Sequence, residues 1–493
     1  MLELHVEVRS ILRDPTLLVE QAFVGGEWLD GSASDRIAVV NPATLETIGS
    51  VPSFGATETR EAIRVAEAVA SEWGALPAAN RARLLEAWYD AIMANHEDLA
   101  VLMTLEQGKP LAESRGEVTY GAAFVKWFAE QARRIYGETI PSPAADRRIL
   151  TLRQPVGVVA AITPWNFPNA MITRKCAPAL AAGCPVVIKP SEVTPFSALA
   201  LARLAERVGF PAGVINVVTG PPEPIGAELT ANPAVRKLSF TGSTAVGKLL
   251  MRQCAATVKR ISLELGGNAP FIVFDDASLD LAIAGVLASK FRNAGQTCVC
   301  ANRILVQDGI YEEFAERLSG AVSDLVVGNG MAEGVTIGPL INGPATEKVL
   351  GHIDDARAKG AKVNVGGGAH ALGKHFVEPT VLTAATSRMR VAHEETFGPV
   401  APLFRFGTEE EALELANSTR YGLAAYFYTE NIRRSWRVAE RLEFGMVGLN
   451  TGSISTEVAP FGGVKESGIG REGAQAGIDE YLETKAFHIG NVA

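Results

Sequence analysis

A cysteine and a glutamate, each next to glycines, could serve as a nucleophile and its general base. Cys298 lies in the run FRNAGQTCVC (residues 291–300), where small and polar residues let the backbone turn and leave the sulfur uncovered. Glu264 lies in LELGGN (residues 263–268), at the end of a predicted strand and directly before two glycines. This pairing suggests covalent catalysis assisted by a general base. The alternative for a single cysteine is a small, buried hydrophobic residue.

A third candidate is an asparagine in the segment PWNFP. Asn166 lies between Trp165 and Phe167, with a proline on either side. A side-chain amide in so stiff a loop is suited to stabilise an oxyanion. The alternative is that Asn166 caps the helix that follows, because asparagine is common at that position.

The segment GSTAVG (residues 242–247) lies between a predicted strand and a predicted helix, as a phosphate-binding loop would. Its glycines let the backbone approach a phosphate, and the helix N-terminus offers unpaired N–H groups and positive potential. Lys189 and Glu192 follow a neighbouring strand and suit the hydroxyls of an adenosine ribose. A glutamate there would accept from a 2′-hydroxyl and repel a 2′-phosphate, which favours NAD over NADP. The alternative is an ordinary surface ion pair.

Two arginines could make a local cationic pocket in this acidic chain. Arg292 lies roughly one helical turn before Cys298, and Arg174 lies on the helix predicted after Asn166. If both face one cavity, they suit a substrate carboxylate. Otherwise they are two unrelated exposed arginines.

The dinucleotide-binding pattern G-x-G-x-x-G occurs at residues 468–473. No apolar strand precedes it, and the chain that follows is too short to complete a strand–helix–strand unit. We therefore interpret this segment as a surface turn.

The composition narrows the class of protein that carries these residues. At 493 residues the chain is too long for one core, so two or three structural units are expected. The net charge of −9 argues against nucleic acid and anionic membranes, and no run of 18 apolar residues predicts a membrane span. Five cysteines without framework spacing indicate reduced thiols and a cytoplasmic protein. No metal site is expected, because the pair Cys298 and Cys300 lacks further ligands nearby.

Alternating strands and helices through the middle of the chain must position these side chains. Apolar strands are predicted at residues 156–162, 186–188, 214–218, 237–240 and 260–263. Such a series predicts an α/β fold with a doubly wound parallel sheet and ligands at the carboxyl ends of its strands. The segments PWNFP, KPSE, GSTAVG and LELGGN all fall at those ends. A second series begins near Pro270, with strands at 271–274 and 303–306.

The flanking segments carry no predicted chemistry. Helices are predicted from Thr57, over about 80–106 and over about 112–136, and a buried helix over 283–291 precedes the Cys298 turn. Residues 147–154 are typical of an exposed edge strand, which another subunit or the chain's own C-terminus would have to cover. This strand is an indication of an oligomer.

Together, the motifs ITPWNFP, LELGGNAP, GQTC and EETFGP resemble those of the aldehyde dehydrogenase superfamily. The resemblance covers essentially the whole chain, from FVGGEWLD to FGGVKESGIGREG. It is closest to the succinate-semialdehyde dehydrogenases, through MTLEQGKPLAE, NAMITRK, KFRNAGQTCVCANR and EVAPFGG.

The resemblance implies two doubly wound parallel-sheet domains, one binding the cofactor and one catalytic, plus a small β oligomerisation extension. The expected boundaries are residues 1–136 and 156–264 for the cofactor-binding domain, 265–458 for the catalytic domain, 137–155 and 477–493 for the oligomerisation strands, and 459–476 for a connecting segment. A homotetramer or homodimer is expected. Neither nucleic acid nor membrane is expected as a partner.

The resemblance also assigns roles to residues of this sequence. Cys298 corresponds to the nucleophile, Glu264 to the base, and Asn166 with the Cys298 backbone N–H to the oxyanion hole. The expected cofactor-binding residues are Trp165, Lys189, Glu192, Gly242, Ser243, Gly247, Glu395 and Phe397. Glu395 would hold the nicotinamide ribose, with Phe397 packed against it.

The remaining assignments concern the substrate and redox control. Arg174, Arg292 and Ser455 correspond to residues that bind the substrate's carboxylate. Cys300 is a candidate redox partner, because similar semialdehyde dehydrogenases can form a disulfide between the corresponding two cysteines.

The resemblance implies NAD(P)-dependent oxidation of succinate semialdehyde to succinate through a cysteine thiohemiacetal and thioester. NAD is the expected cofactor and NADP the alternative, since similar enzymes with a glutamate at the Glu192 position use both. Glutarate semialdehyde or a broad range of aldehydes is the alternative substrate, because one methylene gives only about 10–200-fold discrimination. A CoA-acylating enzyme would usually lack the base, and a non-catalytic protein would not keep Cys298, Glu264 and Asn166 together.

Overall fold

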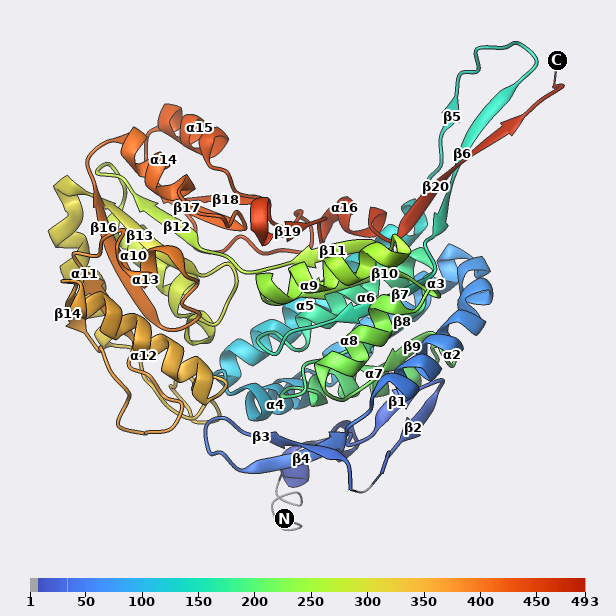
Figure 1. Ribbon diagram of the computed structural model, residues 1–493, viewed down its shortest axis with the longest axis horizontal. Helices are drawn as coiled ribbons and strands as arrows, with labels where there is room; N and C mark the ends of the chain where they lie inside the picture. The colour runs from blue at the N-terminus through green and yellow to red at the C-terminus, as the bar shows by residue number, and fades with distance from the viewer. Residues whose placement is uncertain (1–7, 33, 493) are drawn as a thin grey trace.

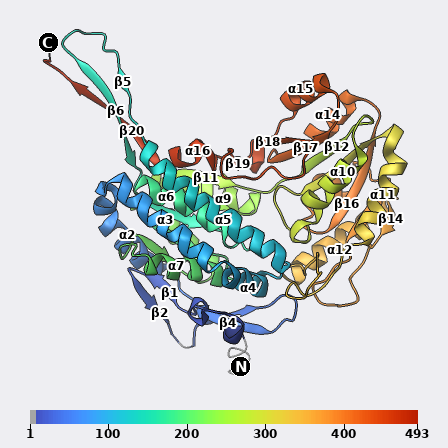
Figure 2. The same ribbon diagram turned by 180° about the vertical axis from the view of Figure 1, so that it is seen from behind.

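The computed structural model describes residues 8–32 and 34–492. Two large sheets, each with helices around it, lie on opposite sides of the molecule, and a third small sheet projects from one end as an arm (Figures 1 and 2). Residues 1–7 and Ala33 of the first predicted domain segment, and Ala493 of the last, lie outside the described residues.

The first large sheet has the order β19-β11-β10-β7-β8-β9-β1-β2. Its parallel centre is formed by β7 (Val158–Ile162), β8 (Val186–Lys189), β9 (Ile215–Val217), β10 (Val235–Thr241) and β11 (Arg260–Glu264). Three short antiparallel strands complete the edges: β1 (Ala22–Val24), β2 (Glu27–Leu29) and β19 (Gly468–Ile469). The central strands are almost entirely buried, as expected for a sheet covered on both faces.

The chain order in this sheet creates a switch point. From β7 the chain proceeds outward to β8 and β9, and then returns to place β10 and β11 on the other side of β7. The helices between these strands are α6 (Ala170–Ala182), α7 (Phe196–Arg207), α8 (Pro222–Ala231) and α9 (Thr244–Cys254). Ligands in such sheets bind where the order reverses, which here is at the carboxyl ends of β7 and β10.

The second large sheet has the order β14-β15-β16-β13-β12-β17-β18 and is parallel except for β14. Its strands are β12 (Ala269–Val273), β13 (Ala301–Gln307), β14 (Lys362–Val365), β15 (Thr380–Thr383), β16 (Val400–Phe406), β17 (Ala424–Tyr428) and β18 (Met446–Leu449). The helices around it are α10 (Leu279–Val286), α11 (Tyr311–Ser323), α12 (Gly343–Ala358), α13 (Arg390–His393), α14 (Glu409–Asn417) and α15 (Ile432–Arg441). The predicted fold class, two parallel α/β units with a small β extension, is confirmed.

The N-terminal part of the chain adds β3 (Arg36–Val40), β4 (Thr47–Pro52), α2 (Ala56–Ala75), α3 (Ala78–Ala94), α4 (His96–Gln107) and α5 (Leu111–Gln131). The single helix predicted over about 80–106 is wrong, because the structure has two helices that break at Asn95. The Asn95 side chain donates to the carbonyl of Ala91 at 2.8 Å. An asparagine that bonds to nearby backbone in this way competes with helix continuation.

The arm is an antiparallel sheet in the order β20-β6-β5. Strand β20 (Leu482–Ile489) pairs along the whole of β6 (Arg148–Pro155), and β5 (Thr139–Ile140) pairs with the other edge of β6. The predicted edge strand is therefore covered by the chain's own C-terminal strand, although Leu152 and Phe487 keep exposed side chains.

The predicted domain boundaries stay a prediction. Within the segment 459–476, expected only to connect, β19 pairs with β11 and α16 (Ala474–Asp479) begins. Among the described residues, no helix is both long enough and apolar enough to cross a membrane.

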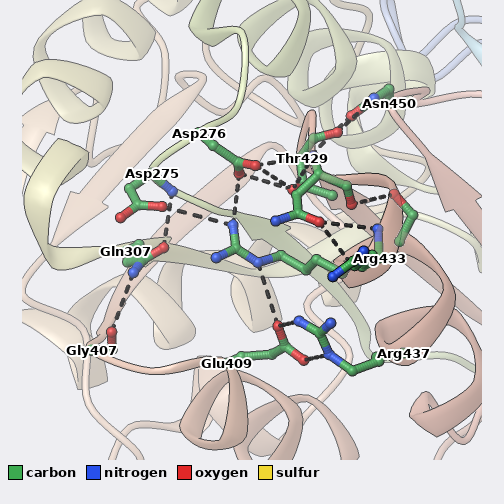
Figure 3. A network of polar contacts seen from close by, with 12 residues as sticks. Asp275, Asp276, Gln307, Gly407, Glu409, Thr429, Arg433, Arg437 and Asn450 are labelled. Carbon is green, nitrogen blue, oxygen red and sulfur yellow. Dashed lines mark hydrogen bonds and ion pairs between the residues drawn. The ribbon is translucent and has the colours of Figure 1, made fainter.

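A charge network joins α14 and α15 to the end of β12 (Figure 3). Arg434 contacts Asp276 at 2.7 Å and Glu409 at 3.4 Å. Arg437 donates to both oxygens of Glu409, at 2.9 and 2.7 Å, and these bonds hold the pKa of Glu409 below its usual value. Thr429 donates to Asp276 at 2.8 Å. Each of these two carboxylates therefore has at least two partners.

Candidate active site

A cavity of about 280 Å³ is lined by residues from both large α/β units. It lies at the ends of β7, β10 and β11, where the first sheet changes direction, and at the turn that precedes β13. Most of the predicted site residues line it: Trp165, Asn166, Arg174, Gly242, Ser243, Glu264, Arg292, Cys298, Glu395, Phe397 and Ser455. The structure thus brings together side chains that are far apart in the sequence.

Cys298 lies on an irregular turn rather than after a simple helix. The predicted buried helix over 283–291 is only partly correct, since α10 ends at Val286 and a π-helical turn follows over Leu287–Phe291. Asn293 and Ala294 then adopt left-handed φ values of 52° and 53°. On the opposite side, a Cβ at Gly267 would lie 2.3 Å from the Cys298 carbonyl oxygen, so only glycine allows this close approach.

The thiol of Cys298 is not activated by its surroundings in this state. Burial, together with the Glu395 carboxylate, raises the pKa of Cys298 to about 12. The thiolate is the nucleophilic form. Attack on a carbonyl therefore requires that the thiol first loses its proton.

Glu264 is a carboxyl group of the kind that accepts protons. Both of its oxygens are buried, and neither has a hydrogen-bond partner among the described residues. Burial raises its pKa well above the usual value, and the nearby charge of Glu472 acts in the same direction. Carboxyl groups with raised pKa values in clefts are typical general acids and bases.

Asn166 is oriented by the turn that carries Cys298. Its side-chain Nδ2 donates to the carbonyl of Gln296 at 2.9 Å. An amide nitrogen has two N–H donors, and this is the one bond from Nδ2 within the described part of the chain, so one donor stays available to a substrate oxygen. The N-cap of α6 is Asn169, which makes the capping alternative for Asn166 wrong.

The two predicted arginines differ in their partners. Arg174 is only 2% exposed, forms an ion pair with Glu472 at 2.7 Å, and lies 3.9 Å from the centroid of the Phe461 ring. Its guanidinium also donates to the Tyr120 hydroxyl at 3.2 Å, and Tyr120 in turn interacts with Ser455. Arg174 faces the cavity, but it is paired with a protein carboxylate that it shares with Lys175.

Arg292 is less firmly paired than Arg174, although its charge acts on the nearby carboxylate of Glu113. Arg292 is half-buried, and its guanidinium lies 4.8 Å from the centroid of the Phe167 ring. No ion pair to Arg292 is found in residues 8–32 and 34–492. Of the two arginines, Arg292 is the one available to a substrate anion.

The segment at residues 468–473 is not a surface turn, and this interpretation is wrong. Glu472 within it is 4% exposed, and Lys175 donates to it at 2.5 Å. Burial acts to raise the pKa of Glu472, but Lys175 and Arg174 hold it below its usual value. Sequence reasoning missed Glu472; the signal that could have found it is the adjacent cations Arg174 and Lys175 in the otherwise mostly apolar segment 170–182.

The model of the aldehyde dehydrogenase family matches residues 28–487. The chain belongs to this family. It is 60% identical over 481 residues to 3-sulfolactaldehyde dehydrogenase of Pseudomonas putida, covering 98% of this chain and 99% of that protein. It is 59% identical over 479 residues to succinate-semialdehyde dehydrogenase [NADP(+)] of Escherichia coli, covering 97% and 99%.

A crystal structure of succinate-semialdehyde dehydrogenase from Burkholderia pseudomallei is also similar. Its TM-score is 0.96 at 59% identity, with 97% of this chain and 99% of that chain covered. The protein is therefore an NAD(P)-dependent aldehyde dehydrogenase, and its resemblance to succinate-semialdehyde dehydrogenases is confirmed.

The loop at 242–247 fits the phosphates of such a cofactor. Ser243 caps α9, accepting from the N–H of Val246 at 3.3 Å, and the helix N-terminus adjoins the cavity. A Cβ at Gly247 would lie 2.4 Å from the Leu265 side chain, so this glycine allows α9 to pack closely on the sheet. The fit rests on the free N–H groups and positive potential of the helix end.

Lys189 and Glu192 lie outside the cavity lining, at the same edge of the sheet. Lys189 ends β8 and contacts Glu192 at 2.7 Å. The lysine side chain is 4% exposed and that of Glu192 39%, so this is not the ordinary surface pair considered as the alternative. Although burial opposes it, Lys189 holds the pKa of Glu192 below its usual value, which keeps the carboxylate ionised.

Glu395 and Phe397 lie together at the nicotinamide end of this aldehyde dehydrogenase's predicted cofactor site. Glu395 accepts from the N–H of Gly267 at 3.0 Å, and burial raises its pKa to about 7. The ring of Phe397 meets Trp165 edge-on, with centroids 5.6 Å apart.

Cys300 is not among the residues that line the cavity. Its side chain is buried, and Lys290 donates to its sulfur at 3.3 Å. Both Cys298 and Cys300 are free thiols in this structure. A redox role for Cys300 stays a prediction. The described residues contain no group of three or more His, Cys, Asp or Glu side chains arranged to hold a metal ion.

Proposed function

We propose that this aldehyde dehydrogenase oxidises succinate semialdehyde to succinate, with NAD preferred over NADP. The observation that carries the substrate assignment is Arg292, which lines the cavity that contains Cys298 and has no ion pair among the described residues. A free guanidinium suits a carboxylate at the far end of a short aldehyde, through charge-assisted hydrogen bonds. The similarity to proteins named for succinate semialdehyde and for sulfolactaldehyde, both acidic aldehydes, supports the same assignment.

The mechanism follows from the positions of three side chains. The Cys298 thiol first releases its proton to solvent, and the thiolate then attacks the aldehyde carbon. The free N–H of Asn166 with the Cys298 backbone N–H stabilises the oxyanion. A nicotinamide cofactor, when bound, accepts the hydride that the adduct must lose to become a thioester. Glu264 then takes a proton from a water molecule, which attacks the thioester carbon and releases the acid and the Cys298 sulfur. Arg174 and Lys175 hold Glu472 and do not take part directly.

The preference for NAD rests on Glu192. A carboxylate next to the adenosine ribose accepts from a 2′-hydroxyl but repels a 2′-phosphate. The ammonium of Lys189 is already paired with Glu192 at 2.7 Å, so its charge is shared with a protein carboxylate. Because one similar protein is named for NADP, the two cofactors must be compared directly.

We also propose that the protein assembles as a homodimer or homotetramer. The arm exposes Leu152 and Phe487 on a projecting sheet, which suits burial against another subunit in a homodimer or homotetramer. A cytoplasmic location stays a prediction from the cysteine usage.

Initial rates with succinate semialdehyde, glutarate semialdehyde and butanal, each with NAD and with NADP, test the proposal. We expect kcat/KM for the acidic aldehydes to exceed that for butanal by about 10–100-fold, the value of a charged hydrogen bond. Arg292→Ala should remove this preference. Arg174→Ala should slow all three aldehydes alike, because its partner is Glu472.

The exposed Arg388 provides a matched control, and Arg388→Ala should leave the preference unchanged. Equal rates with butanal in the unaltered enzyme would contradict the carboxylate assignment and indicate broad specificity. A higher rate with glutarate than with succinate semialdehyde would favour the five-carbon substrate instead. A higher kcat/KM with NADP would contradict the role given to Glu192.

A further inference from the structure

The turn between α4 and α5 contains a buried lysine that the proposed mechanism does not use. The side chain of Lys109 is 1% exposed. Its ammonium donates to the backbone carbonyl of Asn166 at 2.7 Å and contacts Glu117 at 2.5 Å. It also lies 4.1 Å from the centroid of the Phe167 ring. Burying an ammonium is unfavourable unless it is paired and hydrogen-bonded, so these contacts fix its position.

Glu117 holds the other side of the same loop. One of its oxygens contacts Lys109, and the other accepts from the N–H groups of Asn169 and Ala170, at 2.9 and 3.1 Å. These N–H groups belong to the start of α6, where a negative charge is stabilising. The Lys109–Glu117 pair therefore binds the Asn166 loop at two points, one on each side of Phe167.

The same turn is also bonded to the segment that carries Cys298. The side-chain oxygen of Gln107 accepts from the backbone N–H of Lys109 at 3.0 Å, and its amide nitrogen donates to Asn293 at 3.0 Å. Asn293 in turn donates to the Asn166 carbonyl at 3.0 Å. The carbonyl of Asn166 thus receives two donors, one from Lys109 and one from the Cys298 turn.

We propose that Lys109 and Glu117 are positioning residues that set the direction of the Asn166 side-chain amide relative to Cys298. The inference rests on the proposed function, in which this amide stabilises the oxyanion. Two donors on its carbonyl and a bond from its Nδ2 to Gln296 leave Asn166 little freedom to rotate. Displacing a catalytic group by about 1 Å can cost about 10²-fold in rate.

A double-mutant cycle tests this inference. The paired variant Lys109→Met/Glu117→Gln removes both charges together and keeps an oxygen for the N–H groups of α6. It is made in the unaltered enzyme and in Asn166→Ala, and each protein is assayed for kcat, KM, NAD binding and melting temperature. In the unaltered enzyme we expect kcat to fall about 10–100-fold with KM and NAD affinity unchanged. In the Asn166→Ala background the same two substitutions should lower kcat by less than about threefold, because the effects of residues that act as a unit are not additive.

An equal loss in both backgrounds would overturn the inference, since the pair would then act on the whole fold rather than through Asn166. Unchanged kcat in the paired variant would overturn it as well. If Asn166→Ala alone keeps full kcat, the oxyanion role of Asn166 in the proposed function fails too. This result distinguishes a failure of the proposed function from a failure of the positioning role alone. Lys126→Met, an exposed lysine on α5, is the matched control and should change nothing. Lys109→Arg keeps the charge pair and replaces the paired variant in the cycle if that variant does not fold.

Discussion

The charge network at α14 and α15 and the group around Glu264 both combine glutamates with arginines, yet they leave their carboxylates in different states. In the network, Glu409 accepts two bonds from Arg437 and contacts Arg434, and its pKa is lowered (Figure 3). In the cavity, Glu264 has no hydrogen-bond partner among the described residues, and its pKa is raised.

The difference does not come from a lack of cations near Glu264. Arg174 and Lys175 both lie close enough to act on its pKa, but both are bonded to Glu472. The cavity therefore pairs two buried cations with one carboxylate, Glu472, and leaves the other, Glu264, free to exchange protons. We infer that the paired carboxylates of Glu409 and Glu472 support the structure, and that Glu264 serves the chemistry.

The largest expected effect is the loss of the nucleophile. Cys298→Ala should reduce aldehyde oxidation by about 10⁴-fold or more, because no other thiol lines the cavity among the described residues. Cofactor binding, measured by fluorescence titration, should persist. Cys254→Ala, a buried cysteine at the end of α9, is the matched control and should keep full activity. Unchanged turnover in Cys298→Ala would contradict the whole scheme.

Glu264→Gln should separate the first turnover from the later ones. The thioester should form, giving a burst of reduced cofactor in stopped-flow absorbance, and its hydrolysis should then be slower by about 10²–10⁴-fold, the range for general-base catalysis. In the unaltered enzyme the steady-state rate should rise with pH as the raised pKa of Glu264 is passed. A steady state equal to that of the unaltered enzyme would show that Glu264 is not the base.

The smallest expected effects concern the stability of the folded protein. Replacing Glu264 and replacing Glu409 should change this stability in opposite directions at high pH. The raised pKa of Glu264 means that the folded protein binds its proton more tightly than the unfolded chain does. Stability is therefore lost as pH rises above the unfolded value of 4.5 towards the raised folded pKa. Glu264→Gln should remove this loss, so the variant should melt at a higher temperature than the unaltered enzyme at pH 8 and by a smaller margin at pH 5.

Glu409→Gln is the matched counterpart in the charge network. Its lowered folded pKa contributes stability above the unfolded value of 4.5, and this contribution is lost as pH falls through the folded pKa. The variant should be less stable at pH 8, by about 1 kcal/mol, with kcat unchanged. A destabilised Glu264→Gln at pH 8, or a slow Glu409→Gln, would break the distinction between the two groups.

The sequence alone determined the candidate chemistry and the fold class. Cys298, Glu264 and Asn166 could be found because each lies in a short segment with glycine or proline neighbours, and such local patterns reflect the backbone itself. Buried strands alternating with helices then predicted a parallel sheet and placed these segments at its ligand-binding edge. These features depend on residues that are neighbours in the chain.

Only the tertiary structure decided which charges are free. Arg174 and Arg292 look equivalent in the sequence, but in the structure Arg174 is paired with Glu472. Glu472 also accepts from Lys175, although 297 residues separate the two in the chain. Lys109, likewise, reaches the Asn166 carbonyl 57 residues away. A side chain's partner, burial and pKa depend on which elements pack against it, and packing brings together residues whose spacing along the chain carries no record of the contact.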